Sequence, residues 1–338
     1  MGATEGPAQA AGFPPEVEAL VHPTGVQNGV MRADPDACTS CGRCIQNCPY
    51  TCWEMGEDQV PKMRPERTCF SCFNCMVACE AGAISIVQPY EVRGGGYFDT
   101  DFPPIRWPLA PLDAAGNPSE WTGTERLIIE RRSVRNLKQD PVPEPLIRRI
   151  LEAGRFAPSG GNNQPWKFAV VTDSAFIAEL EATIQAVWAG DHFALEDDAV
   201  AASLVGVLPN EVFDPRVRQG LRSTALKELP VFLNAPCVTF IGGNTKMALP
   251  VIEAGICGQN MNLAACALGL GFTWSNFGAV GVERVPELKA KLGFDSTWTV
   301  LAALCIGYPS FKQEGAVPRH YRPVTWFRPG AAGPEIEE

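Results

Sequence analysis

The sequence lacks an apolar run that is long enough to cross a membrane. Its longest candidate, residues 251–274, is interrupted by one glutamate, one glutamine and two asparagines, and we expect it to form a buried helix. An excess of positive charge is also lacking, and the net charge of −10 argues against nucleic acid or an anionic membrane as a general partner. Residues 1–27 have neither the basic start nor the apolar block of a secretory signal. We therefore expect a cytoplasmic protein.

A dinucleotide-binding fingerprint is absent as well. Its glycines open a helix directly after a strand, whereas the glycine run at 94–96 has no helical pattern behind it. Histidine is scarce, at three residues. His192 is a candidate proton donor, although a surface histidine without a catalytic role is the favoured interpretation.

Cysteine, by contrast, is abundant, and eight of the 13 cysteines form two copies of one spacing. Each run reads Cys-x2-Cys-x2-Cys-x3-Cys, and Pro49 follows the first run. This duplication is typical of ferredoxins with two 4Fe-4S clusters, in which the fourth cysteine of each run ligates the other cluster. The spacing predicts one cluster on Cys38, Cys41, Cys44 and Cys79, and a second on Cys69, Cys72, Cys75 and Cys48.

Two structural zinc sites are the alternative, since paired cysteines also suit tetrahedral zinc. Zinc knuckles usually use two separated pairs of ligands, which differs from three cysteines at three-residue intervals and a distant fourth. A disulfide framework is disfavoured because nothing indicates an oxidising compartment. The remaining five cysteines are interpreted as buried packing residues: Cys52, Cys237, Cys257, Cys266 and Cys305.

Composition divides the chain into five segments. A flexible arm at 1–27 precedes the cysteine module at 28–88. Residues 89–121 are dense in proline, glycine and aromatic residues, and we expect them to wrap over the second domain and fix the clusters against it. The second domain spans 122–330, and a tail at 331–338 follows.

Local signals predict the elements of the second domain. Thr122 and Glu125 form a capping-box pattern at the start of one helix, and Pro145 stands in the first turn of another. Buried strands are expected at 167–171, 236–241 and 298–306. Helices that alternate with strands, joined by connections longer than hairpins, predict a layered α and β domain.

Two polar segments of this domain suit a phosphate and a planar ring. Three arginines and a serine at 131–135 can hold a phosphate through forked hydrogen bonds, although such a group alone is more often a solvated surface. The loop at 157–166 contains two glycines, which let its backbone pass close to a ring, and polar side chains that can bond to the edge of the ring. On its own this loop is equally well a helix-to-strand turn.

Together these segments resemble the FMN-dependent nitroreductase family, and the resemblance runs from about Glu120 to Phe327. The Gly-Gln-Asn-rich helix at 254–260 and the Gly-Tyr-Pro at 307–309 belong to the same pattern. The chain is thus similar to a nitroreductase with an N-terminal two-cluster ferredoxin domain. The resemblance implies an α+β fold, with a nitroreductase-like α/β sandwich that forms an intertwined homodimer and binds two FMN molecules between its subunits.

The resemblance also implies roles for residues. The phosphate and pyrimidine side of FMN would be bound by Arg131, Arg132, Ser133 and Arg135, with Arg319 on the phosphate. The ring would be lined from the partner subunit by Pro158, Ser159, Gly160, Asn162 and Gln164. A backbone N–H near the flavin N5 would come from Ser275, Asn276, Phe277 and Gly278, of which Asn276 and Gly278 would bind the cofactor. Many relatives carry Pro and Glu in this loop, so the substrate is left open.

Flavin chemistry explains why clusters and FMN would share one chain. FMN exchanges one or two electrons, so it can collect single electrons from clusters. Cluster potentials can lie near or below about −400 mV, so we expect reduced ferredoxin or a similar low-potential donor. The expected acceptor is a nitro group, quinone, activated alkene or halogenated ring.

Two other functions are considered, of which the first stays open and the second is disfavoured. One is an electron-transfer component that passes electrons to a partner protein, and a cap with a shaped pocket would argue against it. Residues 188–233 would form that cap, with Arg216, Arg218 and Arg222 either holding an anionic substrate or forming a solvated face. The other, a flavin-consuming synthase of the same superfamily, fits poorly because its reaction uses oxygen, which damages exposed clusters.

Overall fold

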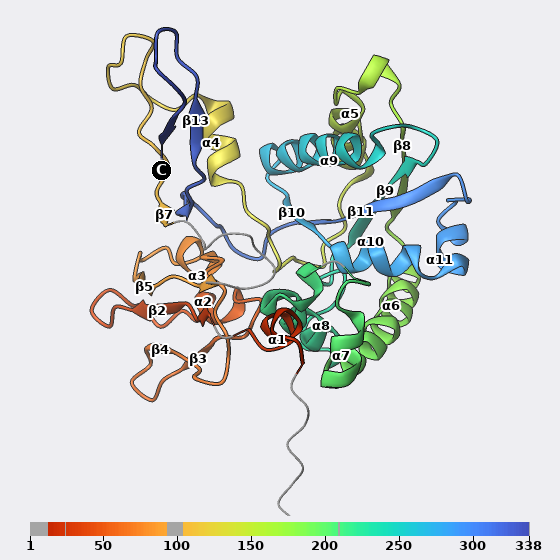
Figure 1. Ribbon diagram of the computed structural model, residues 1–338, viewed down its shortest axis with the longest axis horizontal. Helices are drawn as coiled ribbons and strands as arrows, with labels where there is room; N and C mark the ends of the chain where they lie inside the picture. The colour runs from red at the N-terminus through yellow and green to blue at the C-terminus, as the bar shows by residue number, and fades with distance from the viewer. Residues whose placement is uncertain (1–12, 24, 93–103, 209, 338) are drawn as a thin grey trace, which may run out of the picture.

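The computed structural model describes residues 13–23, 25–92, 104–208 and 210–337. Figure 1 shows the cysteine module in orange beside helices α1 and α8, with the larger α and β domain in green to blue. In the described part of the chain, no helix is both long enough and apolar enough to span a membrane.

A four-stranded antiparallel sheet in the order β10-β11-β9-β8 forms the centre of the larger domain. Its strands are β8 (Trp166–Val171), β9 (Cys237–Asn244), β10 (Gly271–Trp274) and β11 (Trp298–Gly307). The three expected strands are confirmed. Strand β10 corrects the expectation of one helix over 251–274, because helix α9 (Pro250–Ala267) ends before Gly269, whose φ of 76° favours glycine and stops the helix.

Helices cover both faces of this sheet and give the expected α/β sandwich. Helices α5 (Glu144–Arg155) and α9 pack on one face, and α6 (Ser174–Leu195) and α10 (Asn276–Glu283) on the other. Strand β9 alternates between the two cores, since Phe240 packs with the α6 and α10 side and Ile241 with the α5 and α9 side. The α+β prediction is therefore confirmed.

The arginine run is held against the edge of the sheet. Helix α4 (Gly123–Glu130) begins with the predicted capping box, in which Thr122 Oγ1 accepts from Glu125 N at 3.2 Å. The chain then follows β10, where Val134 N donates to Phe272 O at 3.1 Å and Thr273 Oγ1 donates to Val134 O at 2.6 Å. These bonds fix the arginines beside the loop that follows β10.

The cysteine module is a small layer of paired strands and two short helices. Strand β2 (Val30–Ala33) pairs with β5 (Ile84–Gln88), and β3 (Trp53–Met55) pairs with β4 (Pro61–Met63). Each cysteine run carries a four-residue helix, α2 (Arg43–Gln46) in the first and α3 (Asn74–Val77) in the second.

The ends of the chain differ from the expected arm, linker and tail. Helix α1 (Pro15–Val21) buries Leu20 and Val21 in the core of the larger domain, so this part of the expected arm is packed. The tail is not free either, since β14 (Glu335–Glu337) pairs with β13 (Val324–Trp326). The linker pairs with other segments through β6 (Glu91–Val92) with β1 (Val26–Gln27), and β7 (Ile105–Arg106) with β12 (Arg319–His320).

Trp107 in the linker is 56% exposed. The apolar composition of the linker predicts that it wraps over the second domain, and this exposed side chain does not match that prediction. The middle of the linker, including Tyr97, Phe98 and Phe102, lies outside the described residues. The remaining helices are α7 (Asp198–Leu204), α8 (Pro215–Ala225) and α11 (Pro286–Lys291), with 3-10 turns η1 (Gly160–Asn162) and η2 (Asn210–Phe213).

Candidate active site

A cavity of about 360 Å³ lies where the cysteine module meets the larger domain, and we call it the junction cavity. Arg135 and the loop from Thr273 to Phe277 line it from the larger domain. Helix α8 covers another side, as expected for a cap. Pro49 and Tyr50 of the cysteine module complete the wall. The structure thus brings Arg135 of the arginine run to the loop predicted to face N5, and adds Pro49 and Tyr50, which the sequence did not assign to a flavin site.

The loop after β10 is rigidly held at the start of α10. Ser275 is buried, and its Oγ donates to Val231 O at 2.6 Å and accepts from Gly278 N at 3.1 Å. The first N–H groups of a helix, here those of Asn276 and Phe277, have no acceptor within the helix and carry the positive end of its dipole. Both residues line the junction cavity, so this helix start can donate to an electron-rich ring edge.

Arg132 is a buried cation that suits an anionic ligand. It is 5% exposed, and its Nε and Nη2 are buried without a hydrogen-bond partner among the described residues, as is Nε of Arg131. Burial lowers the pKa of Arg132 to about 10, and the neighbouring charges of Arg319 and Arg131 contribute to this shift. Grouped guanidiniums with unpaired buried donors fit a phosphate, because forked hydrogen bonds would satisfy those donors.

Arg131 and Arg319 also line a second cavity, of about 370 Å³, between α4 and β12. Burial and the charge of Arg131 lower the pKa of Arg319. Ser133 forms a β-bridge with Phe272 and so lies within the same run along β10. The predicted phosphate residues therefore line different cavities, Arg131 and Arg319 the second cavity and Arg135 the junction cavity, and their role at a phosphate stays a prediction.

The loop predicted to contact the ring from a partner subunit lies elsewhere. Its Gly160 N donates to Glu253 Oε1 at 2.6 Å near the start of α9, and Ser159 Oγ accepts from Gln164 N at 3.0 Å. Pro158, Gly160, Asn162 and Gln164 are exposed. None of these five residues lines the junction cavity of its own chain. Their placement at a partner's flavin stays a prediction.

His192 is buried, at 7% exposed, and not on the surface as the favoured interpretation had it. Its Nε2 lies 3.2 Å from Glu196 Oε1, and it lines a third cavity, with Phe70 and Arg218. The three cap arginines are all engaged. Arg216 lines the junction cavity and is paired with the buried Asp214, Arg218 donates to the carbonyls of Val21 and Leu195, and Arg222 lies beside Glu228.

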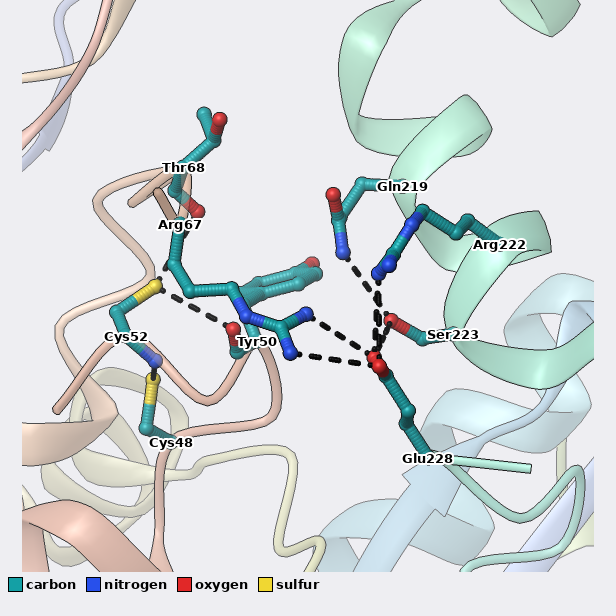
Figure 2. A network of polar contacts seen from close by, with 9 residues as sticks. All are labelled: Cys48, Tyr50, Cys52, Arg67, Thr68, Gln219, Arg222, Ser223 and Glu228. Atoms are coloured by element: carbon teal, nitrogen blue, oxygen red, sulfur yellow. Dashed lines mark hydrogen bonds and ion pairs between the residues drawn. The ribbon is translucent and has the colours of Figure 1, made fainter. Parts of the chain in front are cut away.

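An ion-pair network joins the cysteine module to the cap (Figure 2). Arg67 Nη1 and Nη2 donate to the two carboxylate oxygens of Glu228 at 3.1 and 3.3 Å. Arg222 and Ser223 of α8 also reach Glu228, at 3.4 Å each. The Arg67 guanidinium lowers the pKa of this carboxyl. A forked arginine–carboxylate pair sets orientation as well as distance, so it fixes the module relative to α8.

The two cysteine runs fold as copies of each other. Ser40 and Gly42 in the first run, and Ser71 and Phe73 in the second, all have φ between 51° and 70°. Such left-handed residues turn successive backbone N–H groups inward and form anion-binding nests that are common at iron–sulfur sites. The backbone N–H groups of Cys52 and Ala83 each donate to the fourth sulfur of a run, Cys48 and Cys79, at 3.3 Å.

Several thiols of the two runs lie near enough to one another for their charges to interact, and the crossed ligand pattern stays a prediction. Burial raises the pKa of Cys44 to about 11, and the nearby thiols of Cys79 and Cys41 add to the shift. Burial likewise raises the pKa of Cys75, with contributions from Cys72, Cys48 and Cys69. Across the described ranges, no three His, Cys, Asp or Glu side chains lie close enough together to hold one metal ion. Of the five packing cysteines, Cys52, Cys237, Cys257 and Cys305 are buried as expected, and Cys266 is partly buried.

Comparison with known proteins identifies the family. The sequence profile of the nitroreductase family matches residues 128–308, more than half of the chain. A 5,6-dimethylbenzimidazole synthase of Rhodospirillum rubrum is 30% identical over 208 residues, 60% of this chain and 88% of that protein. An NADH dehydrogenase of Thermus thermophilus is 32% identical over 209 residues, 58% of this chain and 90% of that protein. This chain belongs to the nitroreductase family.

Among solved structures, the chain is similar to a nitroreductase with bound FMN from Desulfitobacterium hafniense. The identity is 24% and the TM-score 0.46, and the similarity covers 59% of this chain and 96% of that chain.

Proposed function

We propose that this protein is an FMN-dependent reductase that receives electrons from a low-potential donor through two 4Fe-4S clusters and passes them to a small organic acceptor. The observation that carries this proposal is the junction cavity, which is lined at once by Arg135, the start of α10 and Tyr50 of the cysteine module. FMN, when bound, would supply the step from single electrons to a two-electron reduction. Arg132, with its unpaired buried donors, supports a phosphate nearby.

The duplicated fold of the cysteine runs supports the clusters. Inward N–H groups and the N–H···S bonds to Cys48 and Cys79 favour negatively charged thiolate sulfur. The alternative, a structural zinc site, needs a closer spacing of the sulfur atoms. Four thiolate sulfurs around one zinc ion would lie about 3.8 Å from one another, since each Zn–S bond is about 2.3 Å, whereas a four-iron cluster holds its thiolate sulfurs further apart. A cytoplasmic location would keep these thiols reduced.

A homodimer would complete the site. Helix α9 exposes an apolar face in the single chain, with Val251 at 66% and Ile252 at 58% exposed, and Phe156 near the end of α5 is 76% exposed. A face of this kind marks an interface. Glu253 on the same helix holds Gly160, so burying α9 against a partner would bring the loop at 158–164 to the subunit boundary.

The cap favours an enzyme over a component that only passes electrons to another protein. Arg216, Val217, Gly220 and Thr224 of α8 line the junction cavity, which therefore has a shaped wall opposite the loop after β10. The Rhodospirillum relative is named a 5,6-dimethylbenzimidazole synthase, and a synthase activity is therefore the second candidate. The cysteine runs at 38–79 lie outside the residues that the family profile matches, and they favour electron delivery instead.

The electron donor that supports turnover distinguishes the proposed reductase from the synthase. Anaerobic turnover should be compared with reduced ferredoxin and with NADH, the donor named for the Thermus relative, across nitro, quinone, alkene and halogenated acceptors. We expect ferredoxin to support turnover and NADH to support little. Equal rates with NADH in protein that holds iron and sulfide would contradict the proposed electron path, and oxygen-dependent loss of FMN would favour the synthase.

The metal content tests the clusters directly. Anaerobically purified protein should contain about eight iron and eight sulfide per chain, because each of two sites holds four of each. Chemical iron and sulfide assays with elemental analysis measure this. Zinc without sulfide would rule out the cluster assignment, whereas four iron and four sulfide would leave only one of the two sites as a cluster.

A further inference from the structure

The two cysteine sets do not have equivalent positions relative to the junction cavity. Cys48 is followed directly by Pro49 and Tyr50, which line the cavity. Cys69 lies two residues after Arg67, whose guanidinium binds Glu228 at the base of the cap. Both cysteines belong to the set completed by Cys72 and Cys75, which we call the inner set. The inner set is thus anchored on both sides of the cavity.

The inner set meets the arginine run at the wall of the junction cavity. Arg135 lines this cavity together with Tyr50, and Tyr50 follows Cys48 of the inner set by two residues. The ring of Tyr50 meets Phe70 edge to face at 4.8 Å, and this contact limits its movement.

The other set, Cys38, Cys41, Cys44 and Cys79, is the outer set. Cys41 is exposed, whereas the other seven cysteines of the two runs are buried or partly buried. By the repeat, the counterparts of Pro49 and Tyr50 are Glu80 and Ala81, and both are exposed. The duplicated sequence therefore presents Pro49 and Tyr50 to the cavity from one half, whereas the matching residues of the other half, one of them charged, are exposed to solvent.

We propose that electrons enter at the outer set and reach the junction cavity from the inner set, with Tyr50 as the contact between them and the flavin. This inference rests on the proposed function and adds the order of the two clusters. With clusters bound at the two sets, each step would move one electron from a reduced cluster to an oxidised neighbour, so a two-electron reduction of the acceptor would need two such passages and protons from solvent. Tyr50 is a positioning residue that closes the gap between Cys48 and the cavity.

Electron paramagnetic resonance of the full-length protein tests the order without turnover. A nearby cluster speeds the spin relaxation of the flavin signal, which is measured by microwave power saturation. Cys41→Ala, with the outer cluster lost, should keep the fast relaxation of the wild type. Cys72→Ala, with the inner cluster lost, should relax like free FMN. The reverse pattern overturns the inference, even where iron, sulfide and FMN contents agree with the proposed function.

A second variant retains all eight ligands in case a cysteine variant fails to fold. Tyr50→Leu should slow flavin reduction after flash reduction of the clusters by about tenfold or more, which corresponds to about 1.4 kcal/mol of barrier. Tyr50→Phe should keep the wild-type rate, and Glu80→Ala, at the place that matches Pro49 in the other half, serves as the control. Equal rates in Tyr50→Leu and the control overturn the role of Tyr50, whereas wild-type protein without iron overturns the proposed function itself.

Discussion

Replacing Cys41 with alanine is expected to abolish ferredoxin-driven reduction of the flavin. The exposed Cys41 thiol is one of four predicted ligands of the outer cluster, and a cluster with three cysteines is not held in its four-iron form. The proposed FMN site consists of residues after Glu120 together with Pro49 and Tyr50, so FMN should still bind. Stopped-flow absorbance with reduced ferredoxin measures the loss, and iron analysis confirms that one cluster is missing.

The same variant contains its own control. When its FMN is reduced chemically, it should reduce an acceptor at a rate close to that of the wild type, because the junction cavity is unchanged. Cys266→Ala is a matched cysteine variant, since Cys266 lies on α9, outside both runs, and is only partly buried. It should keep ferredoxin-driven reduction. Ferredoxin-driven reduction that continues at the wild-type rate in Cys41→Ala would show that the outer cluster is not on the path.

Local sequence signals were enough to predict much of the fold. The capping box at Thr122, the strands at β8, β9 and β11 and the repeat of the cysteine runs depend on residues close together in the chain. The end of α9 was missed because residues 263–274 carry no charged or amide side chain, and an apolar run fits a buried helix and a buried strand equally well. Gly269 was the available signal for the break.

Contacts between distant segments were beyond the sequence. Tyr50 lies within two residues of the predicted ligand Cys48, and nothing local indicates that it faces a cavity. Phe277, which lines the same cavity, is more than 200 residues further along the chain. The difference between Pro49-Tyr50 and Glu80-Ala81 in the two repeats was a usable hint. No such hint exists for the ion pair of Arg67 and Glu228, since two charged residues so far apart in the chain can be paired only once both modules are placed in space.

Replacing Arg132 with methionine is expected to have opposite effects with and without FMN. Methionine fills a similar space without the buried cation, whose Nε and Nη2 lack partners among the described residues. Removing an unpaired buried charge should leave the free energy of unfolding of FMN-free protein unchanged or raise it by up to about 2 kcal/mol. FMN binding should weaken by about 1–3 kcal/mol, the range for losing a hydrogen bond to a charged group. Denaturant unfolding and fluorescence titration measure the two quantities.

Arg149→Met is the matched control, because Arg149 is exposed on α5 and outside the arginine run, so it should change neither quantity beyond about 0.5 kcal/mol. The measurement also separates two partners for Arg132. Burial lowers the pKa of Arg132 and the nearby Cys72 thiol opposes this shift, so the second candidate partner of the guanidinium is the inner cluster. Unchanged FMN affinity together with a lowered cluster potential in Arg132→Met would assign it to the cluster. Weakened FMN binding with both clusters and their potentials intact would place the phosphate at Arg132.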